Sequence, residues 1–222
     1  MRELSAGDDA VLLDFSGADD PARAATRAAR VLREAAAQGR LRLADVVPSG
    51  LSVLVQAGPG EGIDSLAVYR ELRARAHGGA APGEEPPAVT IPVVYDGEDL
   101  AEVAGVTGTD PGAVARAHAA IGWRVQFMGF APGFGYLVPD DEAGNDPAQV
   151  ALFAGLARRD RSRPAVPAGS VAVAAGYSAV YPRVSPGGWF LLGRTDFPMW
   201  DVQATPPATL AAGTRVRFTC LD

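Results

Sequence analysis

Lysine is absent from this chain of 222 residues, and all 20 of its basic residues are arginines. A chain without lysine cannot supply a Walker A phosphate loop, a Schiff-base lysine or a biotinylated lysine. Its one cysteine, Cys220, has no partner for a disulfide within the chain. Its only histidines are His77 and His118, which all but excludes a zinc site built from Cys and His, and we expect no metal site.

Long apolar runs and a positive charge balance are also missing. No apolar run reaches the roughly 18 residues of a membrane span, and the opening MREL lacks the apolar stretch of a secretory signal. The net charge of −6 makes the chain a poor candidate for nucleic-acid binding, because phosphate neutralisation needs a positive face. We therefore expect a cytoplasmic protein that binds neither nucleic acid nor membrane.

The N-terminal third alternates short apolar runs with helical patterns. Residues 10–15 predict a strand, and the Ala- and Arg-rich residues 21–38 predict a helix with proline in its first turn. Apolar runs at residues 41–47 and 51–56, separated by Pro-Ser-Gly, predict a hairpin. Residues 63–76 predict a second amphipathic helix. This order predicts a small α+β domain that ends at residue 76.

A change of composition then separates two domains. Residues 77–88 are rich in Gly, Pro and Glu and have nothing to bury, so we expect a linker there, with no function assigned to His77 within it. Residues 89–222 form the expected second domain. Helices are expected at residues 99–106 and 111–120, the second with a good cap in Thr-Asp-Pro.

Beyond Gly122 the second domain becomes β-rich. Glycine, proline and aromatic residues punctuate many short apolar runs, a pattern typical of a barrel or a sandwich. The strands expected in this domain are residues 89–95, 123–130, 169–174, 178–181, 189–193 and 216–220.

Four segments of this domain combine tight-turn residues with polar groups in apolar surroundings. In the first, RVQFMGFAPGFGYL at residues 124–137, glycines allow close backbone approach to a ligand and phenyl rings can wall a pocket. In the second, RPAVPAGSV at residues 163–171, the turn can offer N–H groups and a hydroxyl to an anion. Composition alone favours the plainer interpretations, a barrel corner packed by aromatics and a turn that enters a strand.

The third and fourth segments are AVYP at residues 179–182 and SPGGWFLLGRT at residues 185–195. Arg194 ends an apolar run, so its charge must reach water or pair with an anion, either a ligand or a structural carboxylate. His118 shares a helix face with Val114, where a histidine is more often a core residue than a catalyst. No Gly-x-Ser-x-Gly elbow is present, which argues against a Ser-His-Asp triad at Ser170.

Taken together, GFxPGFxYL, VPAGSV, YP and SPGGWxLxGRT resemble the family of the B-type subunit of 5-oxoprolinase, also called allophanate hydrolase subunit 1. That family includes the sporulation-kinase inhibitor KipI and the carboxyltransferase region of urea carboxylase. The resemblance is strong over residues 90–220 and weaker over GDDA at residues 7–10 and VVPSGL at residues 46–51. It implies a ferredoxin-like α+β N-terminal domain followed by a cyclophilin-like β-barrel.

The resemblance also implies an activity. The chain would be one subunit of an ATP-dependent amide hydrolase that opens 5-oxoproline to glutamate, inactive alone and acting with a homologous C-type barrel subunit and a third protein. ATP would be bound by the complex. A KipI-like inhibitor of a histidine kinase and the handling of allophanate or another urea-derived substrate are alternatives, whereas a prolyl isomerase rests on barrel analogy alone. An enzyme subunit needs an Arg-lined cleft shared with its partner, and an inhibitor needs only an exposed apolar patch.

The family pattern also suggests site residues. We expect His118 as an acid/base or orienting residue and Arg124 and Arg194 as ligands of carboxylate or phosphate oxygens. The expected substrate- or nucleotide-binding residues are Gly129, Phe130, Pro132, Gly133, Phe134, Tyr136, Pro167, Gly169, Ser170, Tyr181, Gly187, Gly188 and Trp189.

The chain departs from the family pattern in three places. Gly135 replaces a usual proline, Tyr177 replaces a usual glutamine, and the segment over residues 138–163 is longer than usual. This segment opens with acidic residues, has a helical apolar spacing at residues 150–156 and ends with four arginines, Arg158, Arg159, Arg161 and Arg163. It is either a mobile lid that carries arginines toward an anionic ligand or a surface loop whose short helix covers the barrel.

Overall fold

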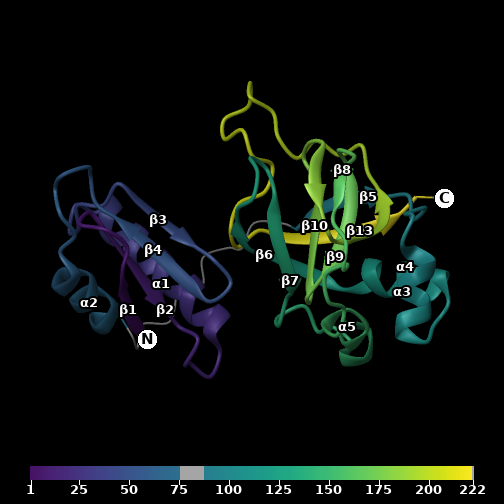
Figure 1. Ribbon diagram of the computed structural model, residues 1–222, viewed down its shortest axis with the longest axis horizontal. Helices are drawn as coiled ribbons and strands as arrows, with labels where there is room; N and C mark the ends of the chain where they lie inside the picture. Colours follow the sequence, from purple (N-terminus) through teal and green to yellow (C-terminus); the bar gives the residue numbers. More distant parts are fainter. Residues whose placement is uncertain (76–87, 222) are drawn as a thin grey trace. The chain divides into compact units, whose positions relative to one another are not determined.

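A computed structural model describes residues 1–75 and 88–221 (Figure 1). The chain divides into two compact units, Met1–Glu85 and Pro86–Asp222. The linker expected at residues 77–88 lies outside the described residues, except for Ala88. No helix within the described ranges is long and apolar enough to cross a membrane.

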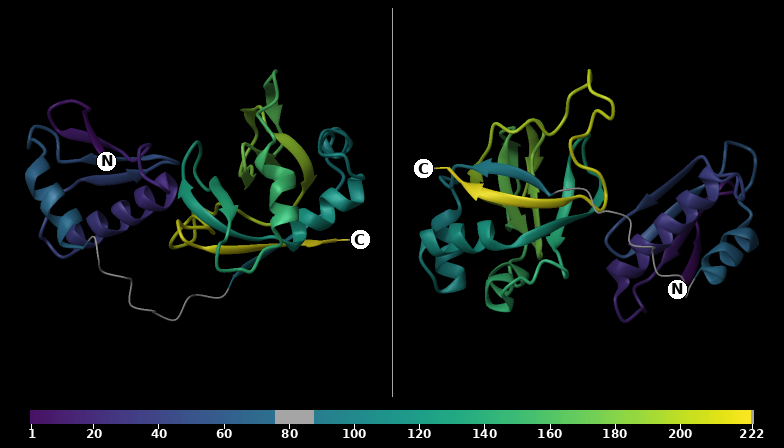
Figure 2. Two further views of the ribbon diagram at one scale, coloured as in Figure 1. Left: turned by 90° about the horizontal axis from the view of Figure 1, so that it is seen from below. Right: turned by 180° about the vertical axis from the view of Figure 1, so that it is seen from behind.

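The first unit is a four-stranded antiparallel sheet with two helices on one face (Figure 2). Asp20 accepts a hydrogen bond from the Arg23 backbone N–H and Pro21 occupies the first turn, so the first helix begins where the sequence predicts. The elements are β1 (Arg2–Ser5), β2 (Ala10–Asp14), α1 (Pro21–Ala37), β3 (Asp45–Pro48), β4 (Ser52–Gln56) and α2 (Ser65–Ala74).

The strand order of this sheet is β1-β2-β4-β3, and its core lies between the sheet and the helices. A ferredoxin-like unit follows the order β-α-β-β-α-β. Here β1, which the sequence did not predict, precedes the unit and takes the edge position beside β2. The expected small α+β layer is confirmed. It differs from a ferredoxin-like unit in that the outer strand β1 comes first in the chain instead of last.

The second unit is built on a seven-stranded sheet in the order β12-β9-β10-β7-β6-β13-β5, beside which β8 and β11 form a two-stranded sheet. Its elements are β5 (Val89–Val93), α3 (Leu100–Thr107), α4 (Pro111–Ala120), β6 (Gly122–Met128), β7 (Gly135–Pro139), α5 (Pro147–Ala154), β8 (Arg163–Val166), β9 (Ser170–Ala174), β10 (Tyr177–Val180), β11 (Ser185–Gly187), β12 (Phe190–Arg194) and β13 (Arg215–Cys220).

The two edges of the seven-stranded sheet come together, so the sheet nearly closes into a barrel. Val94 and Arg194 exchange two backbone hydrogen bonds of 2.9 Å, and the Gly97 N–H donates to the Leu192 carbonyl at 3.1 Å. A Cβ on Gly193 would overlap the Val94 carbonyl, and one on Gly97 would overlap the Leu191 carbonyl. Glycine at these two positions therefore allows the closure, and the expected β-barrel is confirmed.

Helices α3, α4 and α5 gather at one end of this barrel, and the long segment between β12 and β13 extends from the other end (Figures 1 and 2). The main core includes Trp123, Leu192 and Phe218. Phe153 of α5 is also part of this core, which fixes the short helix to the barrel.

Candidate functional site

A pocket of about 200 Å³ opens on the barrel unit where three of the four sequence segments meet. Phe130, Phe134 and Tyr136 come from the first segment, Tyr181 from the third, and Gly187, Gly188 and Trp189 from the fourth. The full lining is Phe130, Phe134, Tyr136, Arg158, Ser162, Tyr181, Pro186, Gly187, Gly188 and Trp189.

The pocket walls belong to a second apolar cluster, separate from the main core. The Phe134 ring meets Tyr181 edge-on at 5.3 Å and Trp189 at 5.8 Å between centroids. Tyr136 meets Trp189 in the same way at 5.7 Å. Edge-to-face contacts of this kind fix ring orientation and add about 0.5–1.5 kcal/mol per pair beyond burial, so the walls are preformed.

Two hydrogen-bond donors on buried side chains of these walls lack a partner. Tyr181 is 2% exposed and Trp189 is 5% exposed, and within the described residues neither the phenol nor the indole N–H forms a hydrogen bond. Neither atom is among the fully buried polar atoms that lack a partner, so both can be reached from the pocket. Both residues line the pocket, so we assign these donors to whatever occupies it.

Arg158 is the one charged residue of the described pocket lining, and it is exposed at the rim of the pocket. No carboxylate among the residues described here pairs with it. Burial raises the pKa of Tyr181 to about 12, while the positive charges of Arg158 and Arg163 act in the opposite direction. Burial also raises the pKa of Tyr136, again opposed by Arg158. Both phenols therefore stay protonated at neutral pH, with a cation close to them.

Backbone geometry at the pocket is unusual in two places. Phe130 has φ of 65° and is 56% exposed, although the left-handed region is unfavourable for a bulky side chain. Gly187 packs so closely on Tyr181 that a Cβ there would overlap the phenol oxygen. The pocket depends on glycine at this position because the Tyr181 ring is enclosed on its other sides.

Asp99 anchors the segment that carries Arg158. One oxygen of this buried carboxylate accepts from Arg159 at 2.5 Å and from Arg163 at 2.7 Å, and the other accepts from the Leu191 N–H at 2.7 Å. Arg159 also lies over the Phe190 ring at 5.6 Å. Two of the four arginines, Arg159 and Arg163, are thus structural, and Arg158 directly precedes the first of them in the chain.

This anchoring favours a covering helix over a mobile lid for residues 138–163. Phe153 is 1% exposed and packs against Trp123 and His118. Of the four arginines, Arg158 is the one that lines the pocket, and Arg161 is exposed and does not.

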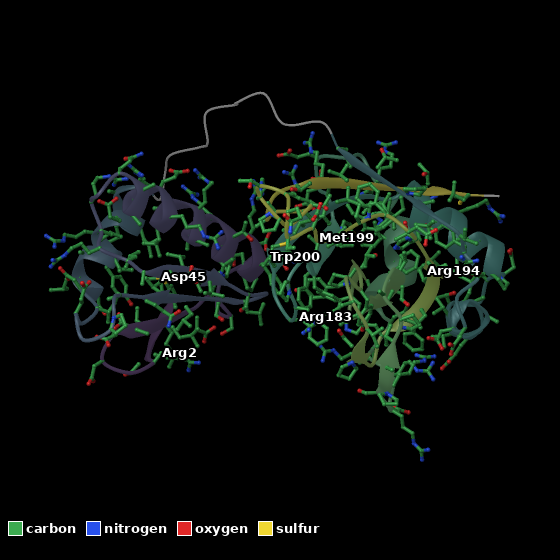
Figure 3. The ribbon with its side chains drawn as sticks, turned by 90° about the horizontal axis from the view of Figure 1, so that it is seen from above. Arg2, Asp45, Arg183, Arg194, Met199 and Trp200 are labelled. Carbon is green, nitrogen blue, oxygen red and sulfur yellow. The ribbon has the colours of Figure 1, made fainter. Side chains whose placement is uncertain are left out.

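The two arginines expected to bind substrate oxygens lie outside the pocket lining. Arg124 pairs with the buried Asp140 at 3.0 Å and with Glu142 at 3.1 Å, and Arg215 joins the same carboxylates. Arg194, whose side chain is 63% exposed, pairs with Asp96 at 2.9 Å. In Figure 3, Arg194 lies away from Arg183, which follows the pocket residue Tyr181 by two positions. Both positions favour structural ion pairs over the predicted ligand contacts.

His118 lies in the main core. Its Nδ1 is 2.8 Å from the Tyr95 hydroxyl and its Nε2 is 2.8 Å from the Ser178 hydroxyl. The Trp123 indole N–H donates to its backbone carbonyl at 3.1 Å. With no exposed surface it has no contact with solvent, and burial lowers its pKa to about 3. This position argues against the predicted acid/base role, because a neutral, enclosed imidazole reaches no substrate.

Two of the remaining predicted residues, Gly169 and Ser170, contact the backbone of Tyr181. Gly169 has φ of 78°, and its N–H donates to the Tyr181 carbonyl at 2.8 Å. The Tyr181 N–H donates to the Ser170 carbonyl at 2.9 Å, so the Pro-Ala-Gly-Ser turn positions Tyr181. The residues Gly129, Pro132, Gly133, Pro167, Gly169 and Ser170 are absent from the lining of the described pocket.

Three lining residues were outside the predicted site. Arg158 was expected to contact a ligand only as part of a lid, and Ser162 and Pro186 were not assigned. Pro186 lies inside the fourth segment and was within reach of sequence reasoning. Ser162 carries no signal in the sequence, since β8 brings it beside Gly188 only in the fold.

The sequence matches the family model for the carboxyltransferase domain, subdomain C and D, over residues 1–210. The chain belongs to this family. Over 133 residues, or 59% of its length, it is 39% identical to the B-type subunit of 5-oxoprolinase from Bacillus subtilis (strain 168). The match covers 51% of that relative, so the chain spans about half the length of the curated relatives it matches.

Two solved structures resemble the fold of this chain. The structure of TTHA0988 is 34% identical, with a TM-score of 0.73, over 96% of this chain and 40% of that one. The urea carboxylase of Kluyveromyces lactis is 17% identical, with a TM-score of 0.72, over 99% of this chain and 22% of that one. The latter likeness shows a shared fold, and it confirms the expected α+β class for this carboxyltransferase-type chain.

The pocket of this family member is small for a nucleotide. Its volume of about 200 Å³ is below the roughly 300–1,000 Å³ typical of sites for drug-sized ligands. Within the described residues, no group of three or more His, Cys, Asp or Glu side chains is placed to hold a metal ion. We therefore assign no step that involves ATP to the residues of this pocket.

Proposed function

We propose that the chain is the B-type component of a two-component, ATP-dependent amide hydrolase that opens 5-oxoproline, and that its aromatic pocket takes the substrate. The name of the Bacillus subtilis relative supports the reaction, at 39% identity over 133 residues. The pocket supports the location, because three of the four segments that carry the family resemblance line it.

The observation that carries the proposal is the chemical character of the pocket lining. It contains donors and a cation but no carboxylate, histidine or cysteine among the described residues. Hydrolysis of an amide develops negative charge on the carbonyl oxygen, which preorganised donors stabilise. Tyr181 supplies such a donor, since burial raises its pKa to about 12 and keeps it protonated at neutral pH.

The same lining supports the proposal of a second component. Activation of a nucleophile and protonation of the leaving nitrogen require groups that titrate near neutral pH. His118 is enclosed in the core with its pKa lowered to about 3, and no other histidine is described. We therefore assign the acid/base group and the ATP site to the partner barrel or to the joint surface.

We expect the purified chain to be inactive alone and active after addition of a homologous C-type barrel subunit. Because a positioned acid or base contributes about 10²–10⁴ in rate, turnover by the chain alone should be at least about 100-fold lower. The measurement is ATP-dependent formation of glutamate from 5-oxoproline by each component and by the mixture. Turnover by the chain alone at the rate of the mixture would overturn the two-component proposal.

A further inference from the structure

The polar groups of the pocket are arranged by charge. The neutral donors belong to Tyr181 and Trp189, which are buried in its walls, whereas the cation, Arg158, is exposed at its rim. The aromatic rings of Phe134 and Tyr136 line the same pocket and meet edge-on at 5.0 Å. An occupant that satisfies all of these groups combines an oxygen acceptor, an apolar body and an anionic group.

We propose that the pocket selects small ring amides that carry a carboxylate, with Arg158 binding the carboxylate and Tyr181 and Trp189 donating to the amide oxygen. The part of this inference that concerns the amide oxygen rests on the proposed function. The part that concerns the carboxylate rests on the Arg158 guanidinium, which has no ion-pair partner among the described residues. It makes Arg158 the residue that determines specificity.

Arg158 is singled out because the neighbouring cations are already engaged. Arg159 and Arg163 share the buried Asp99 carboxylate, and Arg163 also approaches Glu98 at 3.4 Å. Arg158 has no such partner within the residues described, and it borders the same cavity as the two phenols. A planar guanidinium also matches a carboxylate with two parallel hydrogen bonds, an arrangement that a lysine cannot reproduce.

The size of the pocket agrees with this class of ligand. A volume of about 200 Å³ lies below the roughly 300–1,000 Å³ of sites for drug-sized ligands, which favours a compact ligand such as a five-membered lactam acid. The apolar faces of such a ring suit the aromatic walls.

The test is calorimetric binding of 5-oxoproline and of 2-pyrrolidinone, the same lactam without the carboxylate. It uses the full chain, alone and with the C-type barrel subunit present, in the absence of ATP. We expect wild-type protein to prefer 5-oxoproline by at least about tenfold, as a charge-assisted bidentate pair provides. Arg158→Ala should remove this preference and leave the affinity for 2-pyrrolidinone unchanged.

Two further variants make the result specific. Arg161→Ala removes an exposed arginine three positions away that does not line the pocket, and it should keep the full preference. Tyr181→Phe should lower the affinity for both ligands by a similar factor, because both ligands carry the lactam oxygen. Equal affinities in wild-type protein, an unchanged preference in Arg158→Ala, or no binding in either state would overturn the inference. Turnover by the mixture decides the proposed function separately.

Discussion

Replacing Gly187 with alanine is expected to lower the affinity for 5-oxoproline by about 10- to 100-fold, which corresponds to the 1–3 kcal/mol of an overpacked site. A Cβ at this position would overlap the hydroxyl oxygen of Tyr181. The Tyr181 ring is 2% exposed and is held by Phe134 at 5.3 Å, so it has little room to retreat. The added methyl group therefore displaces the donor that the substrate needs.

Gly155→Ala provides the matched control for this substitution. Gly155 ends α5 with φ of −86°, and a Cβ there would meet nothing within 4 Å. This variant should bind and turn over like wild-type protein. Calorimetry gives the affinities, and urea unfolding shows whether each variant keeps its fold. A Gly187→Ala protein that binds with wild-type affinity would show that Tyr181 does not contact the ligand.

Acidification is expected to destabilise the barrel unit through His118, by up to about 4–5 kcal/mol at full effect. Burial lowers its pKa from 6.5 to about 3 in the fold. Between these pH values the unfolded chain binds a proton that the folded chain does not. The stability contribution is therefore complete above pH 6.5 and is lost as the pH falls toward 3, with a slope of up to about 1.4 kcal/mol per pH unit.

Urea unfolding at several pH values between about 7.5 and 4.5 measures this slope. His118→Gln should be less stable than wild-type protein at neutral pH and should show a shallower slope, since glutamine does not titrate. The pKa values of Asp9 and Asp14 are lowered from 3.8 by backbone hydrogen bonds, so Asp9→Asn should change the slope only at lower pH. Equal slopes for wild-type protein and His118→Gln would contradict the burial of a neutral imidazole.

Local signals in the sequence predicted most of the fold. Asp110 and Pro111 start α4 on the predicted residue, because a capping side chain and a proline in the first turn act within a few positions. The strand β1 escaped prediction because all four of its residues are exposed and show no alternation. The strands β8 and β11 contain Pro164 and Pro186, and proline in a strand resembles a turn.

The candidate site was predictable in its apolar part and not in its charged part. The aromatic and glycine motifs mark the walls, since Phe134, Tyr181 and Trp189 converge on one pocket. Arg124 and Arg194 pair with carboxylates 16 and 98 residues away, and a single sequence does not show such pairing in space. Arg158 has the same residue type and lines the pocket, whereas the buried Asp99 carboxylate pairs with its neighbours Arg159 and Arg163.

The most direct test of the pocket as the substrate site is the indole N–H spectrum of protein labelled with ¹⁵N-tryptophan. Trp189 lines the pocket, Trp123 donates to the His118 carbonyl in the core, and Trp200 lies on the segment after β12 (Figure 3). We predict that 5-oxoproline, added to the chain with its C-type partner, shifts the Trp189 resonance in a saturable way and leaves Trp123 in place. A Trp189 resonance that stays fixed at ligand concentrations that saturate turnover would contradict the assignment of substrate to this pocket.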